Sequence, residues 1–314
     1  MNRISTVIFC VALAATCGLP RLSAQETSEE GFSRTVFLEE FTTEMCNNCP
    51  AASVKLHNIL EYPDYEGRVL AVCHHIGFLT DWLTLPEDKE YLWLYNSSQN
   101  FAPGMMIDRV PTLAETSAVF GMTMPSEEEI REEIDKRLAV PSPVRVKVSA
   151  TVGDDGRVTV DVEGEKTPER QKNTMITVYL VENNIEADFQ SGAADGFIHQ
   201  HVTRAMNKAW GEPIEWEGDG FSYQCAFDLD EAWKLSDMEV VAIVNRDVPS
   251  NVLKCEVVNA DAVSLGQSGV AGITGNARTV AAYYDMQGRK LHDMPASGLY
   301  ITVYSDGSAE KVIR

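Results

Sequence analysis

Two cysteines in a C-x-x-C spacing are the residues of this sequence best suited to chemistry. The apolar, aromatic run 36–41 predicts a buried strand, and the run 51–60 predicts a helix. Cys46 and Cys49 therefore lie between a strand and a helix N-terminus, where unpaired N–H groups and the helix dipole stabilise a thiolate on Cys46. Cys49 is near enough to attack a mixed disulfide on Cys46. The pattern predicts a dithiol–disulfide site in which Cys46 is the more exposed thiol.

Two other uses of this cysteine pair stay open. A C-x-x-C is also half of some zinc sites, but the sequence has no second C-x-x-C to complete one. The pair also occurs as an inert structural disulfide. We favour redox or redox-derived use, and the sequence predicts no bound metal or cofactor.

The residues on either side of the pair resemble thioredoxins. Glu40-Phe41 precedes Cys46 as an Asp-Phe pair does in that family, where the buried carboxylate serves the second cysteine. The run Arg109-Val110-Pro111-Thr112-Leu113 is similar to the thioredoxin segment whose cis-proline faces the cysteines. The resemblance implies that Cys46 attacks, Cys49 resolves, Glu40 relays the proton and a cis Pro111 shapes the substrate groove.

The motif itself departs from thioredoxins. Met45 stands where they carry Trp, and Asn47-Asn48 replaces Gly-Pro. These departures favour an alternative function, a non-enzymatic surface or adhesin-like binding protein in which the disulfide only stiffens the turn. Glu40 and Pro111 favour a thiol–disulfide oxidoreductase acting on protein thiols or disulfides.

Four histidines are further candidates. His74 and His75 end the predicted strand 68–76, at the sheet edge expected to carry the cysteines, which suggests a general base or a metal ligand. The alternative, which we favour, is two histidines hydrogen-bonded in the loop after a strand. His199 and His201 would share one face of a strand as a pair of metal ligands, but no clear cysteine or carboxylate partner lies nearby in sequence. A structural role is favoured for them as well.

The N-terminus and the charge indicate export. Residues 1–24 have a basic start, a short apolar run and a small-residue cleavage site, which predicts a signal peptide. Cys17 raises a lipoprotein alternative, although Thr16 makes a poor lipobox. No other run is long and apolar enough to span a membrane. The formal charge of −21 disfavours nucleic acid as a partner.

The pattern changes along the mature chain. An α/β thioredoxin-like domain is predicted at 34–140, closed by a helix with a capping box at Ser126. The proline-containing linker 140–143 precedes alternating strands that predict an antiparallel β-sandwich at 144–265. A small-residue linker separates a short β C-terminal tail at 276–314. Few contacts are expected to cross the first linker, so that the second domain folds without the first.

Three further cysteines remain after signal cleavage. Cys225 and Cys255 fall on predicted strands, which suggests a structural bridge between them. Cys73 is predicted to be a buried free thiol.

Several features together resemble the twenty-eight-kilodalton outer-membrane protein family of Bacteroidetes. They extend from Glu40-Phe41 through His74-His75 to the runs 199–202 and 210–213. The resemblance implies an exported protein of the periplasm, outer membrane or cell surface, with an unknown surface ligand as the alternative partner. The tail is similar to sorting segments of exported cargo in the same bacteria; the alternative is a hairpin that completes the fold.

Overall fold

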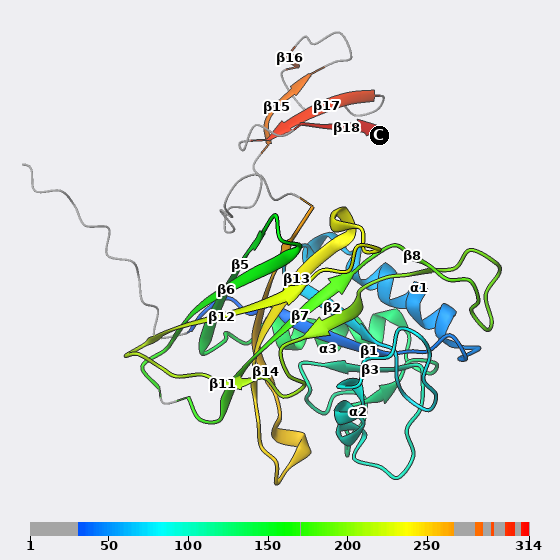
Figure 1. The fold of residues 1–314 in the computed structure, drawn as a ribbon, viewed down its shortest axis with the longest axis vertical. Coiled ribbons are helices and arrows are strands. Elements are labelled where there is room, and N and C mark those ends of the chain that lie inside the picture. The colour runs from blue at the N-terminus through cyan, green and yellow to red at the C-terminus, as the bar shows by residue number, and fades with distance from the viewer. Residues whose placement is uncertain are drawn as a thin grey trace, which may run out of the picture.

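The computed structural model describes residues 31–169 and 171–266, with the strands 280–284, 290–291, 299–304 and 309–313 of the tail. The predicted signal peptide lies outside these residues. The described chain is rich in β-structure with few helices, as predicted (Figure 1). No helix in these ranges is long and apolar enough to cross a membrane.

A nine-stranded mixed sheet organises the fold (Figure 1). Its strand order is β14-β13-β7-β10-β2-β1-β3-β4, and β11 pairs with β7. β1 and β2 are parallel, whereas β3 and β13 run antiparallel to their neighbours β1 and β7. The strand bounds are β1 Val36–Phe41, β2 Val69–His74, β3 Gly104–Ile107, β4 Phe120–Gly121, β7 Thr174–Glu182, β10 Val202–Met206, β11 Glu212–Pro213, β13 Met238–Arg246 and β14 Val257–Ser264.

Helices cover one face of the first part of the sheet. Alternate β1 residues Val36 and Leu38 point toward α1 (Cys49–Leu60) and α3 (Glu127–Leu138), which bury Leu56 and Ile130 against them. The Ser126 side chain caps α3 in a full capping box, as predicted. The first strand is therefore fixed in position directly before the cysteines.

The other face of the same sheet joins the two halves of the sequence. Phe37 of β1 stacks on Tyr179 of β7, with ring centroids 5.8 Å apart. Both belong to one buried apolar cluster, which also takes in α2 (Asp88–Tyr91) and the 3₁₀ turns Leu92–Tyr95 and Val252–Lys254. Because this cluster draws on both predicted domains, the expectation that few contacts cross the linker is wrong.

A second layer covers the later strands. β5 (Val144–Val152), β6 (Arg157–Lys166) and β12 (Gly220–Asp228) form a three-stranded antiparallel sheet. β5 and β6 form the predicted hairpin, and their alternate valines pack against inward-facing residues of β7 and β13. The two layers thus bury one apolar cluster between them.

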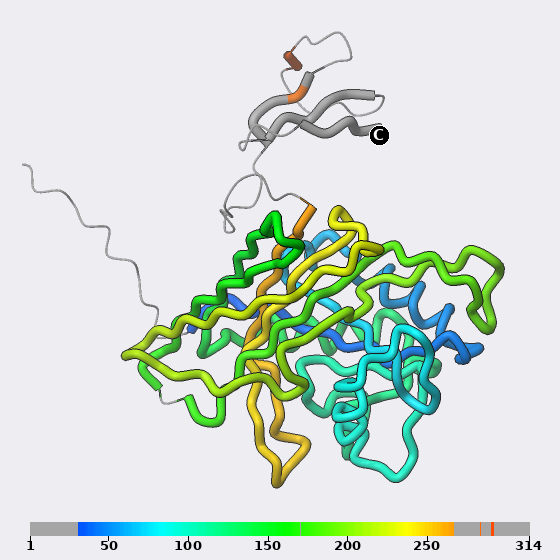
Figure 2. Tube along the Cα trace, in the orientation of Figure 1, coloured from blue at the N-terminus to red at the C-terminus, as the bar shows by residue number. Residues whose placement is uncertain are grey.

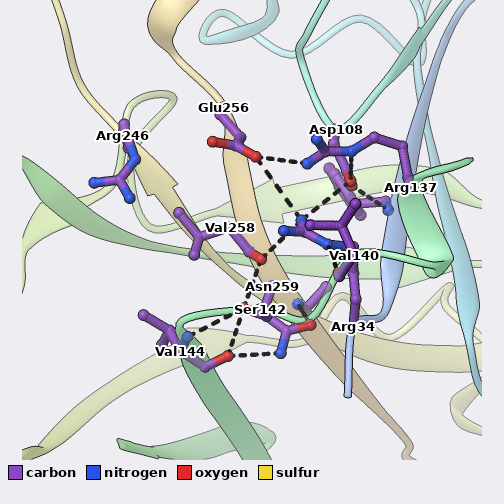
Figure 3. Close-up of polar contacts among 12 residues, drawn as sticks. Arg34, Asp108, Arg137, Val140, Ser142, Val144, Arg246, Glu256, Val258 and Asn259 are labelled. Carbon is purple, nitrogen blue, oxygen red and sulfur yellow. Dashed lines mark hydrogen bonds and ion pairs between the residues drawn. The ribbon is translucent and has the colours of Figure 1, made fainter. Parts of the chain in front are cut away.

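Polar contacts close the junction at the linker (Figure 3). Asp108 accepts from Arg34 at 3.4 Å and from Arg137 at 2.7 Å, and Arg137 also reaches Glu256 at 2.6 Å. Ser142, inside the linker, donates to the Val258 carbonyl of β14. These contacts hold the linker 140–143 between the parts of the chain that precede and follow it.

Two cysteine predictions are settled by the fold. Cys225 lies on β12 and Cys255 in the buried cluster beside the 3₁₀ turn Val252–Lys254, and both are free thiols, so the predicted bridge is wrong. They fail to meet because they belong to different layers. Cys73 is a buried free thiol, as predicted.

The described strands of the tail form a separate four-stranded sheet. They are β15 (Val280–Tyr284), β16 (Lys290–Leu291), β17 (Leu299–Tyr304) and β18 (Ala309–Ile313).

Candidate functional site

The cysteine pair lies at the start of α1 as a disulfide. Cys46 and Cys49 are bonded, with their Cα atoms 5.3 Å apart. The helix begins at Cys49, with Asn48 as N-cap, so Cys46 belongs to the preceding turn rather than to the helix start. This corrects the predicted boundary. Cys49 is the residue at the positive end of the helix dipole.

A loop from the second half of the sequence covers this turn. It runs from β8 (Ile185–Glu186) to β9 (Ile198–His199) (Figure 2). Its residues 190–192 contact the turn. Gln190 Nε2 donates to the Cys46 carbonyl at 3.2 Å, and the Ser191 N–H donates to the Glu44 carbonyl at 2.8 Å. Cys46 and Cys49 are 3% and 2% exposed. Exposure therefore does not distinguish the two sulfurs, contrary to the prediction.

Gly192 brings the loop closest to the cysteine turn. Its φ is +80°, and a Cβ at this position would lie 2.1 Å from the Asn47 carbonyl oxygen. A side chain here would both strain the backbone and collide with the turn. The fit of the loop over the disulfide thus depends on this glycine.

We expect Gly192→Ala to speed reduction of the disulfide by dithiothreitol about 10-fold, because a backbone strain of roughly 1–2 kcal/mol loosens the loop. Acid quenching followed by mass spectrometry measures the rate. Gly156→Ala is the matched control, since Gly156 has a φ of +77° but no atom within 4 Å of its Cβ position. Equal rates in the two variants would contradict a loop that protects the disulfide.

A small cavity of about 10 Å³ lies beneath the disulfide. Its wall includes Glu40, Cys49, Cys73, His75 and His199. The volume is close to that of one water-sized probe. Four buried polar atoms of its wall have no hydrogen-bond partner among the described residues: Glu40 Oε1, His75 Nε2, Gln190 Oε1 and His199 Nε2. Buried polar groups are nearly always hydrogen-bonded, so four unpaired atoms around one small cavity call for an explanation, of which a redox or catalytic role is one.

Glu40 lies where the prediction placed it. Its neighbour across the β1–β2 pair is Cys73, whose Sγ donates to Glu40 Oε2 at 3.1 Å. Burial raises the pKa of the Glu40 carboxyl. This hydrogen bond and the nearby histidines lower the pKa by a smaller amount, so it lies above its usual value. Burial likewise holds the pKa of the Cys73 thiol well above its usual value. The Glu40 carboxyl thus keeps its proton to a higher pH than a solvent-exposed glutamic acid does.

His75 also reaches the cavity, and it is paired with a carboxylate. Its Nδ1 lies 2.9 Å from Asp81 Oδ2. Burial alone would raise the pKa of Asp81, but His75 and the backbone N–H groups of Glu44 and Leu83 together outweigh burial, so the pKa lies below its usual value. The His199 ring packs edge-on to His75 at 4.8 Å between centroids, and burial first, with His75 second, lowers its pKa to about 4. His199 is therefore neutral at pH 7.

Other predicted site residues lie elsewhere. The Val110–Pro111 bond is not cis; the cis bond is Ala102–Pro103. Pro111 follows the end of β3 that pairs with Leu38, while the start of β3 pairs with Phe41 next to the cysteine turn. Pro111 is therefore displaced toward the opposite end of the strand, and its predicted role in a groove beside the cysteines is wrong.

The remaining histidines have other surroundings. His74 is buried between Asp88 at 3.0 Å and Glu39 at 3.4 Å, on the sheet face opposite Glu40. His201 lies beyond β9 with a φ of +58° and faces Glu239 at 3.7 Å, so it does not share a strand face with His199. Within the described ranges no group of three or more His, Cys, Asp or Glu side chains is arranged to hold a metal ion.

Sequence reasoning missed Asp81 and Gln190. Asp81 lies six residues after His75, in a loop without periodicity, and only its hydrogen bonds reveal its place. Gln190 is separated from Cys46 by 144 residues, and no local pattern indicates their contact.

Comparison with known proteins gives the family. The solved structure of HBP35 of Porphyromonas gingivalis shares the fold, with a TM-score of 0.66 and 19% identity over 90% of this chain and 98% of that chain. A domain of the outer membrane lipoprotein Omp28 from the same organism is 21% identical, with a TM-score of 0.28 over 40% of this chain and 88% of that chain. None of the curated proteins matches. The family model of outer membrane protein Omp28 matches residues 101–264, more than half of the sequence, and the chain therefore belongs to the Omp28 outer membrane protein family.

Proposed function

We propose that this envelope protein exchanges thiols and disulfides at Cys46 and Cys49. The observation that carries the proposal is the cavity beneath the disulfide, where Cys49 shares a wall with Glu40 and with three other buried polar groups that lack partners. A disulfide that only stiffens a turn does not need such groups. A disulfide that gains and loses protons does.

The strand order around the site supports a thioredoxin-like unit within residues 34–140. β1 leads into the disulfide and the helix α1, β2 runs parallel to β1, and β3 runs antiparallel to it on the other side. Residues 144–265 are proposed as a β-sandwich, on the support of the two sheets that enclose one apolar cluster. The two units share a sheet, and we propose them as parts of a single body.

The proposed reaction has two steps. The Cys46 thiolate attacks a disulfide of a partner protein, which forms a mixed disulfide and releases one partner thiolate. Cys49 then gives up its proton, with Glu40 as acceptor, and attacks Cys46 Sγ; the second partner sulfur leaves and takes a proton. The exposed neighbours Met45, Asn47 and Asn48 support Cys46 as the sulfur that a partner meets first.

The location of the protein agrees with this chemistry. Outer-membrane proteins are exported to the cell envelope, as the sequence predicted, and the membership of this chain in the Omp28 family places it there. Disulfides persist in such compartments. Protein thiols or disulfides of the envelope are therefore the partners that we propose.

The reduction potential tests the proposal. Equilibration of the full chain with glutathione buffers, followed by mass mapping of Cys46 and Cys49, is expected to give a value between about −120 and −270 mV, the range of exchange-active pairs. Cys46→Ser should abolish transfer of electrons to a model protein disulfide, and Cys225→Ser should leave the transfer unchanged.

A structural disulfide is the second candidate. The burial of both sulfurs under the loop 187–197 favours it, as does the departure from thioredoxins at Met45 and Asn47-Asn48. In that case the potential lies below about −300 mV, and the protein is a binding module of the envelope. The two functions are thus separated by one measurement.

A further inference from the structure

The hydrogen bond between His75 and Asp81 fixes which nitrogen carries the imidazole proton. Asp81 Oδ2 lies 2.9 Å from His75 Nδ1, and an ionised carboxylate only accepts hydrogen bonds. The low pKa of Asp81 keeps it ionised. In neutral His75 the proton therefore lies on Nδ1, and Nε2 is left with a free lone pair.

Asp81 is itself rigidly held. Its Oδ1 accepts from the Leu83 N–H at 2.9 Å, and its Oδ2 also accepts from the Glu44 N–H at 2.9 Å. Glu44 belongs to the turn that carries Cys46. One carboxylate thus ties the imidazole to the backbone of the disulfide turn.

His75 lines the cavity that Cys49 also lines. His75 is buried, and its Nε2 has no hydrogen-bond partner in the described part of the chain. The titratable groups that share the cavity with it are Glu40 from β1, Cys49 from α1, Cys73 from β2 and His199 from β9. None of these is a cation at pH 7, because the low pKa of His199 keeps that ring neutral. These four groups therefore bring no positive charge to the cavity at pH 7.

We infer that His75 is a second proton acceptor for Cys49, positioned by Asp81 and reached through the cavity. The inference rests on the proposed exchange reaction. When a mixed disulfide occupies Cys46, the Cys49 proton passes to His75 Nε2, and the Cys49 thiolate attacks Cys46 Sγ. The Cys46–Cys49 bond forms as the bond to the partner sulfur breaks, and the departing thiolate receives the proton. No additional oxidant is required.

His75 complements Glu40 in this role. Glu40 already accepts from the Cys73 thiol, and its raised pKa favours the protonated form. The free Nε2 of His75 is a second acceptor for the Cys49 proton beside this carboxyl. Asp81 does not touch the reacting sulfurs and acts as a positioning residue.

The tautomer is tested first, by long-range ¹H–¹⁵N spectra of the histidine rings in the oxidised wild-type protein. We expect the Nδ1–H form for His75 at neutral pH, and a mixture of both forms in Asp81→Asn. A wild-type ring with the proton on Nε2 would overturn the inference whatever the activity of the protein, because Nε2 would then have no lone pair to accept the Cys49 proton.

The closing step is tested second. The reduced full chain is mixed with oxidised glutathione and quenched with acid, and mass spectrometry follows formation of the Cys46–Cys49 bond between pH 5 and 9. We expect His75→Gln to slow closure about 100-fold at pH 7 and to move the profile to higher pH. His57→Gln, on the exposed side of α1, is the control and should match the wild type.

Two failures can be told apart. If the Cys46–Cys49 bond does not form in the wild-type protein, the proposed exchange function is rejected. The NMR measurement of the tautomer then tests the proton position on His75 independently. Normal closure in both wild type and His75→Gln would reject the role of His75 and leave the exchange function intact.

Discussion

Replacing Arg109 by methionine is expected to lower the free energy of unfolding by about 3–5 kcal/mol, the usual cost of breaking a buried ion pair. The Arg109 side chain is fully buried, and its Nε and Nη2 reach the two carboxylate oxygens of Glu39 at 2.8 and 2.6 Å. Nη2 also donates to the Tyr179 hydroxyl at 2.8 Å, and the guanidinium lies 4.8 Å from the ring centre of Tyr91. Methionine fills much of the same space but leaves the Glu39 charge unpaired in the core.

Urea denaturation of the oxidised protein measures this loss. Arg145→Met is the matched control, because Arg145 pairs with Glu165 on the surface and should contribute nothing measurable. The double variant Arg109→Met with Glu39→Gln should recover part of the stability, since no buried charge is then left alone. A loss in Arg109→Met no larger than in the control would show that the pair is not essential to the core.

The same pair predicts how stability depends on acid. Burial alone would raise the pKa of Glu39, but Arg109 outweighs burial, and His74 adds to its effect, so that the pKa falls to about 2. The folded-state pKa lies below the unfolded value, so this stabilisation is complete above about pH 4.5 and is lost as the pH falls toward 2. The contribution is roughly 3 kcal/mol. In Arg109→Met this step of the stability–pH curve should disappear.

Replacing Asp108 by asparagine is expected to cost about 3 kcal/mol, because two guanidinium groups then lose their shared counter-charge. Arg34 and Arg137 approach Asp108 Oδ2 at 3.4 and 2.7 Å, and Oδ1 accepts from the Phe37 N–H at 2.8 Å (Figure 3). Asparagine can retain the last contact, so the variant isolates the effect of charge. The polar contacts that hold the linker 140–143 in place should therefore weaken.

Thermal unfolding and limited proteolysis at residues 139–143 follow this change. Lys136→Ala is the control: Lys136 lies on the same helix as Arg137, its side chain is 64% exposed, and it pairs only with Glu133 at 2.6 Å. No measurable shift is expected for it. An unchanged melting temperature in Asp108→Asn would mean that the ion pairs of Asp108 do not hold the parts of the chain before and after the linker together.

Local patterns in the sequence determined much of the secondary structure. Alternation of apolar residues predicted the hairpin of β5 and β6, and the capping box at Ser126 predicted the start of α3; both are confirmed. The spacing of Cys46 and Cys49 predicted their pairing, which the disulfide confirms. These features depend on residues within about one turn or one hairpin of each other, so the chain encodes them locally. The family and the cell-envelope location were also recognised from the sequence.

Predictions that required two distant segments to meet were less successful. The Cys225–Cys255 bridge was inferred from predicted strands and the cis bond at Pro111 from resemblance. The structure contradicts both, because the two cysteines lie in different layers and the Val110–Pro111 bond is not cis. The two-domain pattern also concealed a shared core, since the alternation of β7 does not reveal that one of its faces packs on Phe37 of β1. Periodicity identifies a buried face but not its partner.

The site shows the same division. Spacing supplied Cys46 and Cys49, and the resemblance to thioredoxins supplied Glu40; all three lie within ten residues of one strand–turn–helix unit. Only the tertiary structure brought Asp81 to His75 and laid Gln190 across the cysteine turn. Hydrogen bonds between loops depend on the packing of the sheet beneath them, and the sequence of either loop alone does not specify that packing. The pairing of the cysteines could therefore be predicted from the sequence, whereas the buried polar groups and the loop that cover the pair were decided by the fold.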